Sequence, residues 1–370
     1  MPCLQPDSGK GAMPYDMQWL RDLREVSPGG YPLFFSNSPE RINTQSLPGN
    51  PHQGVLWHYK SPQNITPVRI RMYIWHAHYA KPMTAEDPLP GPAHLGITLR
   101  NPMQAGNLVV TESRRRVSPF TATNPLPRGI CLAKALLGDT LDPYPINDVP
   151  AGSNTLVATH SLADGTGVGA VYDFWVLSDG AAHQFELRTV VSTVEANLTG
   201  LLGDPIAPHN GGGRGYWETN QISAEVFPEM APANPGEHWS ITRAGGPDQL
   251  FTSDTSFDPA NAVTNSGNYG VIYDPITIVL ANAMLPAFTV RARLASRNTT
   301  EPYGGAMDRG TGVLGVPALE YNPNTGVGEV VFLRDIAVPR GGAATPWSFR
   351  LTHAGAAAMP VSVLLSALNP

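Results

Sequence analysis

Within residues 68–79, two kinds of side chain alternate from Val68 to Trp75. The even positions up to Ile74 carry Val, Ile, Met and Ile, and the odd positions up to Trp75 carry Arg, Arg, Tyr and Trp. A period of two predicts a β-strand with one face in a hydrophobic core. The other face bears arginine and aromatic side chains, so it needs a second sheet or a partner surface to cover it. We therefore expect a central strand of a β-sandwich here.

The rest of the chain repeats this pattern in short segments. The 37 glycines and 37 prolines are spread along the sequence, which is typical of an all-β protein with many turns. We expect two tandem β-sandwich domains of jelly-roll type, at 31–199 and 216–370, joined by a Gly/Pro-rich linker at 200–215. One small helix is predicted at 130–137, where Cys131, Leu132, Ala135 and Leu136 share a face.

Residues 1–30 are expected to form an N-terminal arm that contains a short helix. Apolar side chains at helical spacing follow a capping Asp16, and 27–30 (Ser-Pro-Gly-Gly) would end the helix. The apolar residues of this helix are Trp19, Leu20, Leu23 and Val26. The helix either packs on the first domain or docks on a neighbouring subunit, and in the second case these four residues are the subunit contacts.

Composition excludes several classes of partner. The net charge is -6 and charged residues make up 15% of the chain, so the basic stripe of a nucleic-acid-binding protein is absent. No apolar run approaches the length of a membrane span, and the N-terminus lacks the pattern of a standard signal peptide. The two cysteines, Cys3 and Cys131, are too few for a disulfide scaffold, and whether they pair is left open.

His76 and His78 are the candidate metal ligands. Two histidines at alternate positions of a strand point to the same side, as in many copper and zinc sites, and a divalent metal is the one cofactor that the sequence suggests. A cupin site would need a glutamate four or five residues after His78, whereas Glu86 follows eight residues later. The alternative is that both histidines lie in the core and bond to the backbone or to a tyrosine.

No catalytic residue is assigned. Asp173, Asp179 and Glu186 lie on or near adjacent predicted strands, where paired carboxylates serve β-sandwich glycosidases and lyases, but solvent-facing carboxylates are equally typical of strands. The Gly-x-Ser-x-Gly motif of a hydrolase is absent from the sequence. If they are exposed, the aromatic residues Tyr73, Trp75, Trp175 and Trp217 would offer stacking surfaces for a glycan.

Three segments carry a resemblance to a known group of proteins. They are 35–41 (Phe-Ser-Asn-Ser-Pro-Glu-Arg), 71–76 (Arg-Met-Tyr-Ile-Trp-His) and 267–273 (Gly-Asn-Tyr-Gly-Val-Ile-Tyr). The chain resembles secreted or surface proteins of Gram-positive, spore-forming bacteria that carry copper amine oxidase N-terminal-like (stalk) domains. The oxidase forms its quinone from a Tyr followed by Asp or Glu, whereas Gly270 follows Tyr269 here. The resemblance therefore implies surface location and β-architecture rather than oxidase activity.

These observations favour a non-enzymatic structural protein. We expect it to self-assemble into a filament, coat or appendage at a bacterial cell or spore surface, with the N-terminal arm linking subunits. Two alternatives remain open: an extracellular glycan-binding or glycan-degrading protein, and a viral capsid or appendage subunit.

Overall fold

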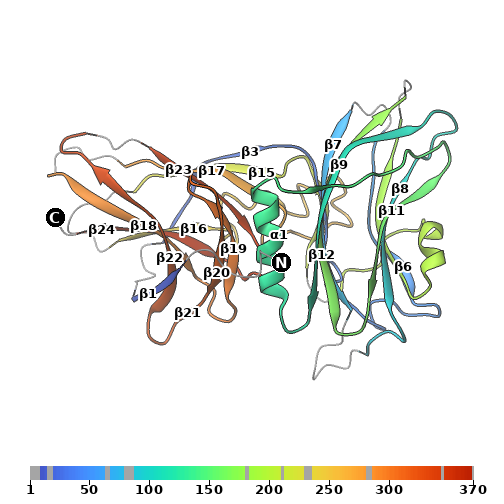
Figure 1. Ribbon diagram of the computed structural model, residues 1–370, viewed down its shortest axis with the longest axis horizontal. Helices are drawn as coiled ribbons and strands as arrows, with labels where there is room; N and C mark the ends of the chain where they lie inside the picture. Colours follow the sequence, from blue (N-terminus) through green and yellow to red (C-terminus); the bar gives the residue numbers. More distant parts are fainter. Residues whose placement is uncertain are drawn as a thin grey trace.

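The computed structural model confirms an all-β protein. It describes residues 9–14, 20–62, 67–78, 87–179, 183–209, 212–228, 236–280, 286–342 and 346–368. These ranges contain four β-sheets, the helix α1 (Pro125–Leu137) and the short 3-10 helix η1 (Glu195–Gly200). Figure 1 shows α1 near the middle of the molecule, with two sheets on either side of it.

The first half of the chain forms two of the sheets. The first, here called the β7 sheet, runs in the order β10 (Asp142–Pro143), β9 (Leu108–Thr121), β12 (Thr166–Ser178), β7 (Val68–His78), β4 (Leu33–Ser36) and β14 (Arg214–Trp217), with β5 (Arg41–Ile42) also paired to β7. The second, the β8 sheet, runs β11 (Asn154–Leu162), β8 (Ala93–Arg100), β13 (Glu186–Ser192) and β6 (Gln53–Lys60). The predicted strand at 68–79 is thus a central strand, as expected.

The second half forms the other two sheets, and the N-terminal arm joins both. The β18 sheet runs β1 (Lys10–Pro14), β22 (Val327–Val338), β18 (Phe288–Ser296), β24 (Val361–Leu368), β16 (Glu237–Ile241) and β2 (Leu20–Asp22), with β21 (Tyr321–Asn322) also paired to β22. The β23 sheet runs β20 (Val313–Leu319), β19 (Tyr303–Asp308), β23 (Trp347–His353), β17 (Ile272–Ile278), β15 (Gln221–Val226) and β3 (Arg24–Gly29).

Alternation along β7 divides the strand between two hydrophobic clusters. Ile70, Met72 and Ile74 belong to a cluster shared with the β8 sheet. Tyr73 and Trp75, on the opposite face, belong to a second cluster that includes α1 and the sheets of the second half. Both aromatic residues are 2% exposed. The helix α1 and the second half of the same chain therefore cover this outer face, which the sequence predicted to be covered.

The helix α1 includes the predicted segment 130–137 and begins five residues earlier. It packs against β9 and β12 on one side and against β19, β20 and β23 on the other. Its approach to the second half is close, because a Cβ added at Gly129 would lie 2.1 Å from the carbonyl oxygen of Gly355. Cys131, which is buried in this helix, is disulfide-bonded. The other cysteine, Cys3, lies outside the described residues.

The predicted N-terminal helix is wrong for the described part of the arm, which is extended. Leu20–Asp22 forms β2, parallel to β16, and Arg24–Gly29 forms β3, antiparallel to β15. Residues 15–19 lie outside the described residues. Helical spacing alone cannot compete here, because two sheet edges offer backbone partners and Leu23, between the strands, is buried at 3% exposure. Pro28 is compatible with β3 because β3 is an edge strand.

The predicted linker at 200–215 makes specific contacts with the first half. The amide of Ile206 donates to the carbonyl of Val55 at 2.8 Å, and Arg214 donates to the carbonyls of Leu56 and Ile206, both at 2.8 Å. β14 then pairs with β4 before the chain enters the second half. Across the described ranges, no helix is both long and apolar enough to cross a membrane.

Candidate functional site

His76 and His78, separated by one residue, both lie on the buried inner face of β7, as the alternation predicts. His76 bonds through Nδ1 to the carbonyl of Pro39 at 2.7 Å and through Nε2 to the hydroxyl of Ser36 at 3.1 Å. His78 donates from Nδ1 to the carbonyl of Leu162 at 3.0 Å, since its Nε2 accepts from the Leu89 amide. All four ring nitrogens therefore have protein partners.

Burial lowers the pKa of His76 to about 4, so its ring is neutral near pH 7. A neutral imidazole could ligate a metal, but the acceptor nitrogen of His76 would first have to lose its present hydrogen bond. Among the described residues, no group of three or more His, Cys, Asp or Glu side chains is placed to hold a metal ion. The histidine pair therefore matches the core alternative, with backbone carbonyls as its main partners.

The candidate carboxylates are not brought together. Asp173 on β12 points to the face of the β7 sheet that α1 and the second half cover, because its neighbours Tyr172 and Phe174 point into the opposite cluster. Glu186 on β13 is in the other sheet and faces away from the shared cluster, since Leu187 faces into it. The two carboxylates thus lie on opposite outer faces of the paired sheets, so Asp173 and Glu186 do not form a two-carboxylate site.

Asp173 and Glu186 each have arginine partners. Asp173, at 1% exposure, accepts hydrogen bonds from Nε and a terminal nitrogen of Arg71, both at 3.0 Å, and from the hydroxyl of Tyr31. Arg69 and Arg114 lie 3.7 and 3.9 Å from it. Burial alone would raise the pKa of Asp173, but the charge of Arg71, its hydrogen bond and that of Tyr31 lower it overall.

Glu186 makes similar contacts with two arginines. Arg100 lies 3.1 Å from its carboxylate, and the fully buried Arg188 contacts the same oxygen. Burial opposes ionisation, yet the hydrogen bonds and charges of both arginines lower the pKa of Glu186. Asp179, the third candidate, is exposed and accepts a hydrogen bond from the Asn107 amide at 2.9 Å. These contacts are structural.

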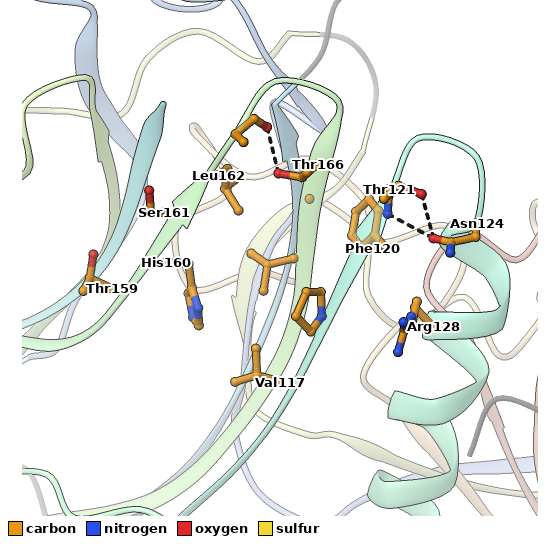
Figure 2. A pocket seen from close by; sticks show the side chains of 14 residues that line it. Val117, Phe120, Thr121, Asn124, Arg128, Thr159, His160, Ser161, Leu162 and Thr166 are labelled. Atoms are coloured by element: carbon orange, nitrogen blue, oxygen red, sulfur yellow. Dashed lines mark hydrogen bonds between the residues drawn. The ribbon is translucent and has the colours of Figure 1, made fainter. Parts of the chain in front are cut away.

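A pocket that the sequence did not reveal opens between β11 and the start of α1. Its volume is about 600 Å³. Figure 2 shows Thr159, His160 and Ser161 of β11 on one side, with Phe120, Asn124 and Arg128 on the other. The lining mixes hydroxyl, amide and apolar groups and, among the described residues that form it, includes no carboxylate.

His160 lies in the lining of this pocket together with the cationic side chain of Arg128. Its Nε2 lies 2.8 Å from the hydroxyl of the fully buried Tyr172. Burial, with a contribution from the charge of Arg115, lowers the pKa of His160 to about 4, so the ring is neutral near pH 7. The described lining therefore offers hydroxyl and amide groups and the guanidinium of Arg128 to a polar molecule.

The predicted aromatic stacking surfaces are mostly unavailable. Tyr73, Trp75 and Trp217 are at most 2% exposed. Trp75 stacks on Phe120 with ring centroids 4.4 Å apart. Trp175 alone among the four predicted platforms is partly exposed, and its indole nitrogen donates to Glu112 at 3.1 Å. A glycan would have to use another surface.

The N-terminal arm forms the most extensive set of specific contacts among the predicted sites. Of its predicted contact residues, Leu23 is buried, Leu20 and Val26 are half-buried, and Trp19 lies outside the described residues. Leu23 sits where the chain passes from the β18 sheet into the β23 sheet, and it belongs to the large cluster of the second half. The arm thus pairs with sheets of its own chain, and it does so as extended strands rather than as a helix.

Charged pairs accompany the strand pairing of the arm. Arg21 lies 3.3 Å from Glu237, whose side chain is 1% exposed, and Arg243 lies 2.9 Å from Asp22. Farther along the β18 sheet, Lys10 lies 2.7 Å from Glu329. Sequence reasoning missed the partners Glu237, Arg243 and Glu329. Pairs separated by more than 200 residues leave no local pattern to detect.

Comparison with known proteins gives no assignment. No protein-family model matches the sequence, and a search of curated proteins finds no match.

Proposed function

We propose that this protein is a non-enzymatic structural subunit that self-assembles, and that its N-terminal arm links subunits. In this proposal the two halves act as tandem β-sandwich domains, one around each of the two large hydrophobic clusters. The resemblance noted above suggests a bacterial cell or spore surface as the location.

The observation that carries the proposal is the position of the arm at sheet edges. Strands β1, β2 and β3 occupy three of the four edges of the β18 and β23 sheets in the described part of the chain, and β20 occupies the fourth. Edge strands are the elements through which proteins exchange or add strands between molecules. An arm that pairs by backbone bonds and a few charged contacts can make the same contacts with another copy, which is the physical basis of domain swapping.

Electron microscopy and light scattering of native and arm-deleted protein test this proposal. We expect ordered filaments, sheets or closed particles from the native chain, and their loss when residues 1–30 are removed. Because deletion also uncovers sheet edges, a point variant is needed: Arg243→Asp opposes Asp22, and the double variant Asp22→Arg/Arg243→Asp restores the pair. Assembly should weaken in the single variant and return in the double. Native protein that stays monomeric at high concentration would contradict the proposal.

A viral capsid or appendage subunit would give the same result, and the form of the particles would distinguish it. A glycan-binding or glycan-degrading protein is the second candidate, favoured by the pocket at His160 and its lining of hydroxyl, amide and guanidinium groups. Monomeric native protein that is retained on a polysaccharide column, with retention weakened by Asn124→Ala, would support that candidate.

A further inference from the structure

The pocket between β11 and the start of α1 has the size and position of a small-molecule site. Its volume of about 600 Å³ lies within the range of about 300–1,000 Å³ that such sites span. It opens beside β11, which is an edge strand of the β8 sheet. Its apolar lining includes Val117, Leu162 and Val168, which belong to the hydrophobic cluster of the first half or pack against it. A ligand here would contact the edge of that core and the polar groups around it.

His160 presents a hydrogen-bond donor to this pocket. Its Nε2 lies 2.8 Å from the hydroxyl of Tyr172, which also receives a hydrogen bond from Arg115. A guanidinium can only donate, so the proton of the Tyr172 hydroxyl is directed to Nε2. A neutral histidine whose Nε2 accepts carries its own proton on Nδ1. The ring therefore offers an N–H group at the nitrogen that does not bond to Tyr172.

Two further nitrogen donors lie on the opposite side, at the start of α1 (Figure 2). The side-chain oxygen of Asn124 accepts hydrogen bonds from the amide and the hydroxyl of Thr121, both at 3.0 Å. The NH₂ group of Asn124 is therefore the part of this side chain that can serve a ligand. Arg128, one turn along α1, adds a guanidinium to the lining, and all of its polar groups are donors.

Nitrogen donors on both sides of the pocket favour a ligand that is rich in acceptors. Arg128 also brings a positive charge, and the described lining contains no carboxylate. Arg115, which is not part of the lining, places a second positive charge close to His160. Charge-assisted hydrogen bonds between a guanidinium and a carboxylate are about twice as strong as neutral ones. These features favour an anion over a neutral molecule.

The charge and the hydroxyl groups of the lining narrow the class of anion. One cationic side chain in the described lining matches the single charge of a carboxylate better than the charge of about −1.5 to −2 on a phosphate monoester. The hydroxyls of Thr159 and Ser161, together with the apolar lining, suit the hydroxyl groups and C–H faces of a sugar ring.

We propose that this pocket binds a hexuronic acid, either as the free sugar or as a residue of an acidic glycan. Its carboxylate is bound by Arg128, and its hydroxyl groups are bound by the polar side chains of β11. This inference goes beyond the proposed self-assembly and does not depend on it.

Calorimetric titration of the native full-length protein with matched sugars tests the inference. D-glucuronate and D-galacturonate differ from D-glucose and D-galactose in carrying a carboxylate at C6. At least one of the two acids should bind, and it should bind about tenfold or more tightly than its neutral sugar, because the charge-assisted contact with Arg128 is lost in the neutral sugar.

Variants at the start of α1 locate the binding. Arg128→Gln should weaken binding of the acid by about tenfold or more, and Arg128→Lys, which keeps the charge, should retain part of it. Asn124→Ala, at an exposed position, should also weaken it. The matched control is Arg116→Gln: Arg116 lies on β9 outside the lining and pairs with the exposed Asp142, so this variant should bind as the native protein does. Thermal unfolding of each variant shows whether it is folded.

Retention on immobilised polygalacturonate distinguishes the two sources of the ligand. Retention that Arg128→Gln weakens indicates a glycan, and binding of a free acid without retention indicates the small molecule. The inference is overturned if neither acid nor the polymer binds, if the neutral sugars bind as tightly as the acids, or if Arg116→Gln and Arg128→Gln lose binding equally. Self-assembly is measured separately by microscopy, and none of these results changes its outcome.

Discussion

Replacing Asp173 by Asn should destabilise the protein strongly, because it removes the negative charge from a buried cluster of arginines. Asp173 and Arg71 are register partners on β12 and β7, and their side chains are 1% and 7% exposed. Arg69 and Arg114 lie within 4 Å of the same carboxylate. Breaking a buried pair by removing one partner costs about 3–5 kcal/mol, since a charge is left buried without compensation.

The chain offers a matched exposed pair for comparison. Arg291 and Asp335 are also register partners on neighbouring strands, with both hydrogen bonds at 2.7 Å, but each side chain is 36% exposed. An exposed pair contributes about 0–1 kcal/mol because water and salt screen it. Asp335→Asn should therefore cost much less stability than Asp173→Asn, although the hydrogen bonds of this exposed pair are shorter.

Chemical denaturation followed by tryptophan fluorescence measures both changes, and double-mutant cycles isolate each pair. The coupling between Asp173→Asn and Arg71→Met should exceed about 2 kcal/mol, and the coupling between Asp335→Asn and Arg291→Met should be much smaller. If the two aspartate variants lost equal stability, the argument that burial decides the value of these pairs would be refuted.

Two further predictions concern stability. Burial lowers the pKa of His76 to about 4 and that of His353 to about 3, from an ordinary value of 6.5. The unfolded chain therefore binds more protons than the folded chain, and the free energy of unfolding falls as the pH drops from about 6.5 toward 4. Each histidine should lower the free energy of unfolding by about 2 kcal/mol at pH 5. Thermal unfolding at pH 7.5 and 5.0 measures this loss of stability. His353→Gln should reduce the difference in stability between the two pH values. An unchanged difference would show that His353 does not cause the loss. Gly129→Ala should destabilise the protein because the new Cβ would lie 2.1 Å from the Gly355 carbonyl oxygen, although alanine favours a helix over glycine by about 1 kcal/mol. Gly11→Ala is the control, since a Cβ there meets nothing within 4 Å. A Gly129→Ala variant that is more stable than the native protein would show that the Gly355 backbone moves aside.

Sequence patterns of short range predicted much of the architecture. The alternation of 68–79 identified a central strand, its buried face and the need for a cover, because side chains on a strand alternate between faces whatever the rest of the chain does. The shared face of Cys131, Leu132, Ala135 and Leu136 located α1 for the same kind of reason. The histidine pair was correctly placed on the inner face, with its backbone-bonded alternative stated.

The arm shows where such patterns stop. Leu20, Leu23 and Val26 have helical spacing, but tertiary contacts decide the conformation of so short a segment. Here β15 and β16 pair with the segment as extended strands. Arg21 and Glu237 lie 216 residues apart in the chain, so no local signal joins them. Opposite orientation of Asp173 and Glu186 likewise follows from their belonging to different sheets.

The sequence by itself determined the strand periodicity, the position of the central strand and the helix, and the side of β7 on which each residue lies. Only the tertiary structure decided which strands pair, what covers the outer face of β7 and where the arm is seated. The physical reason is that periodicity is a property of neighbouring residues, whereas sheet order, burial of charge and the covering of edges depend on contacts between segments far apart in the chain.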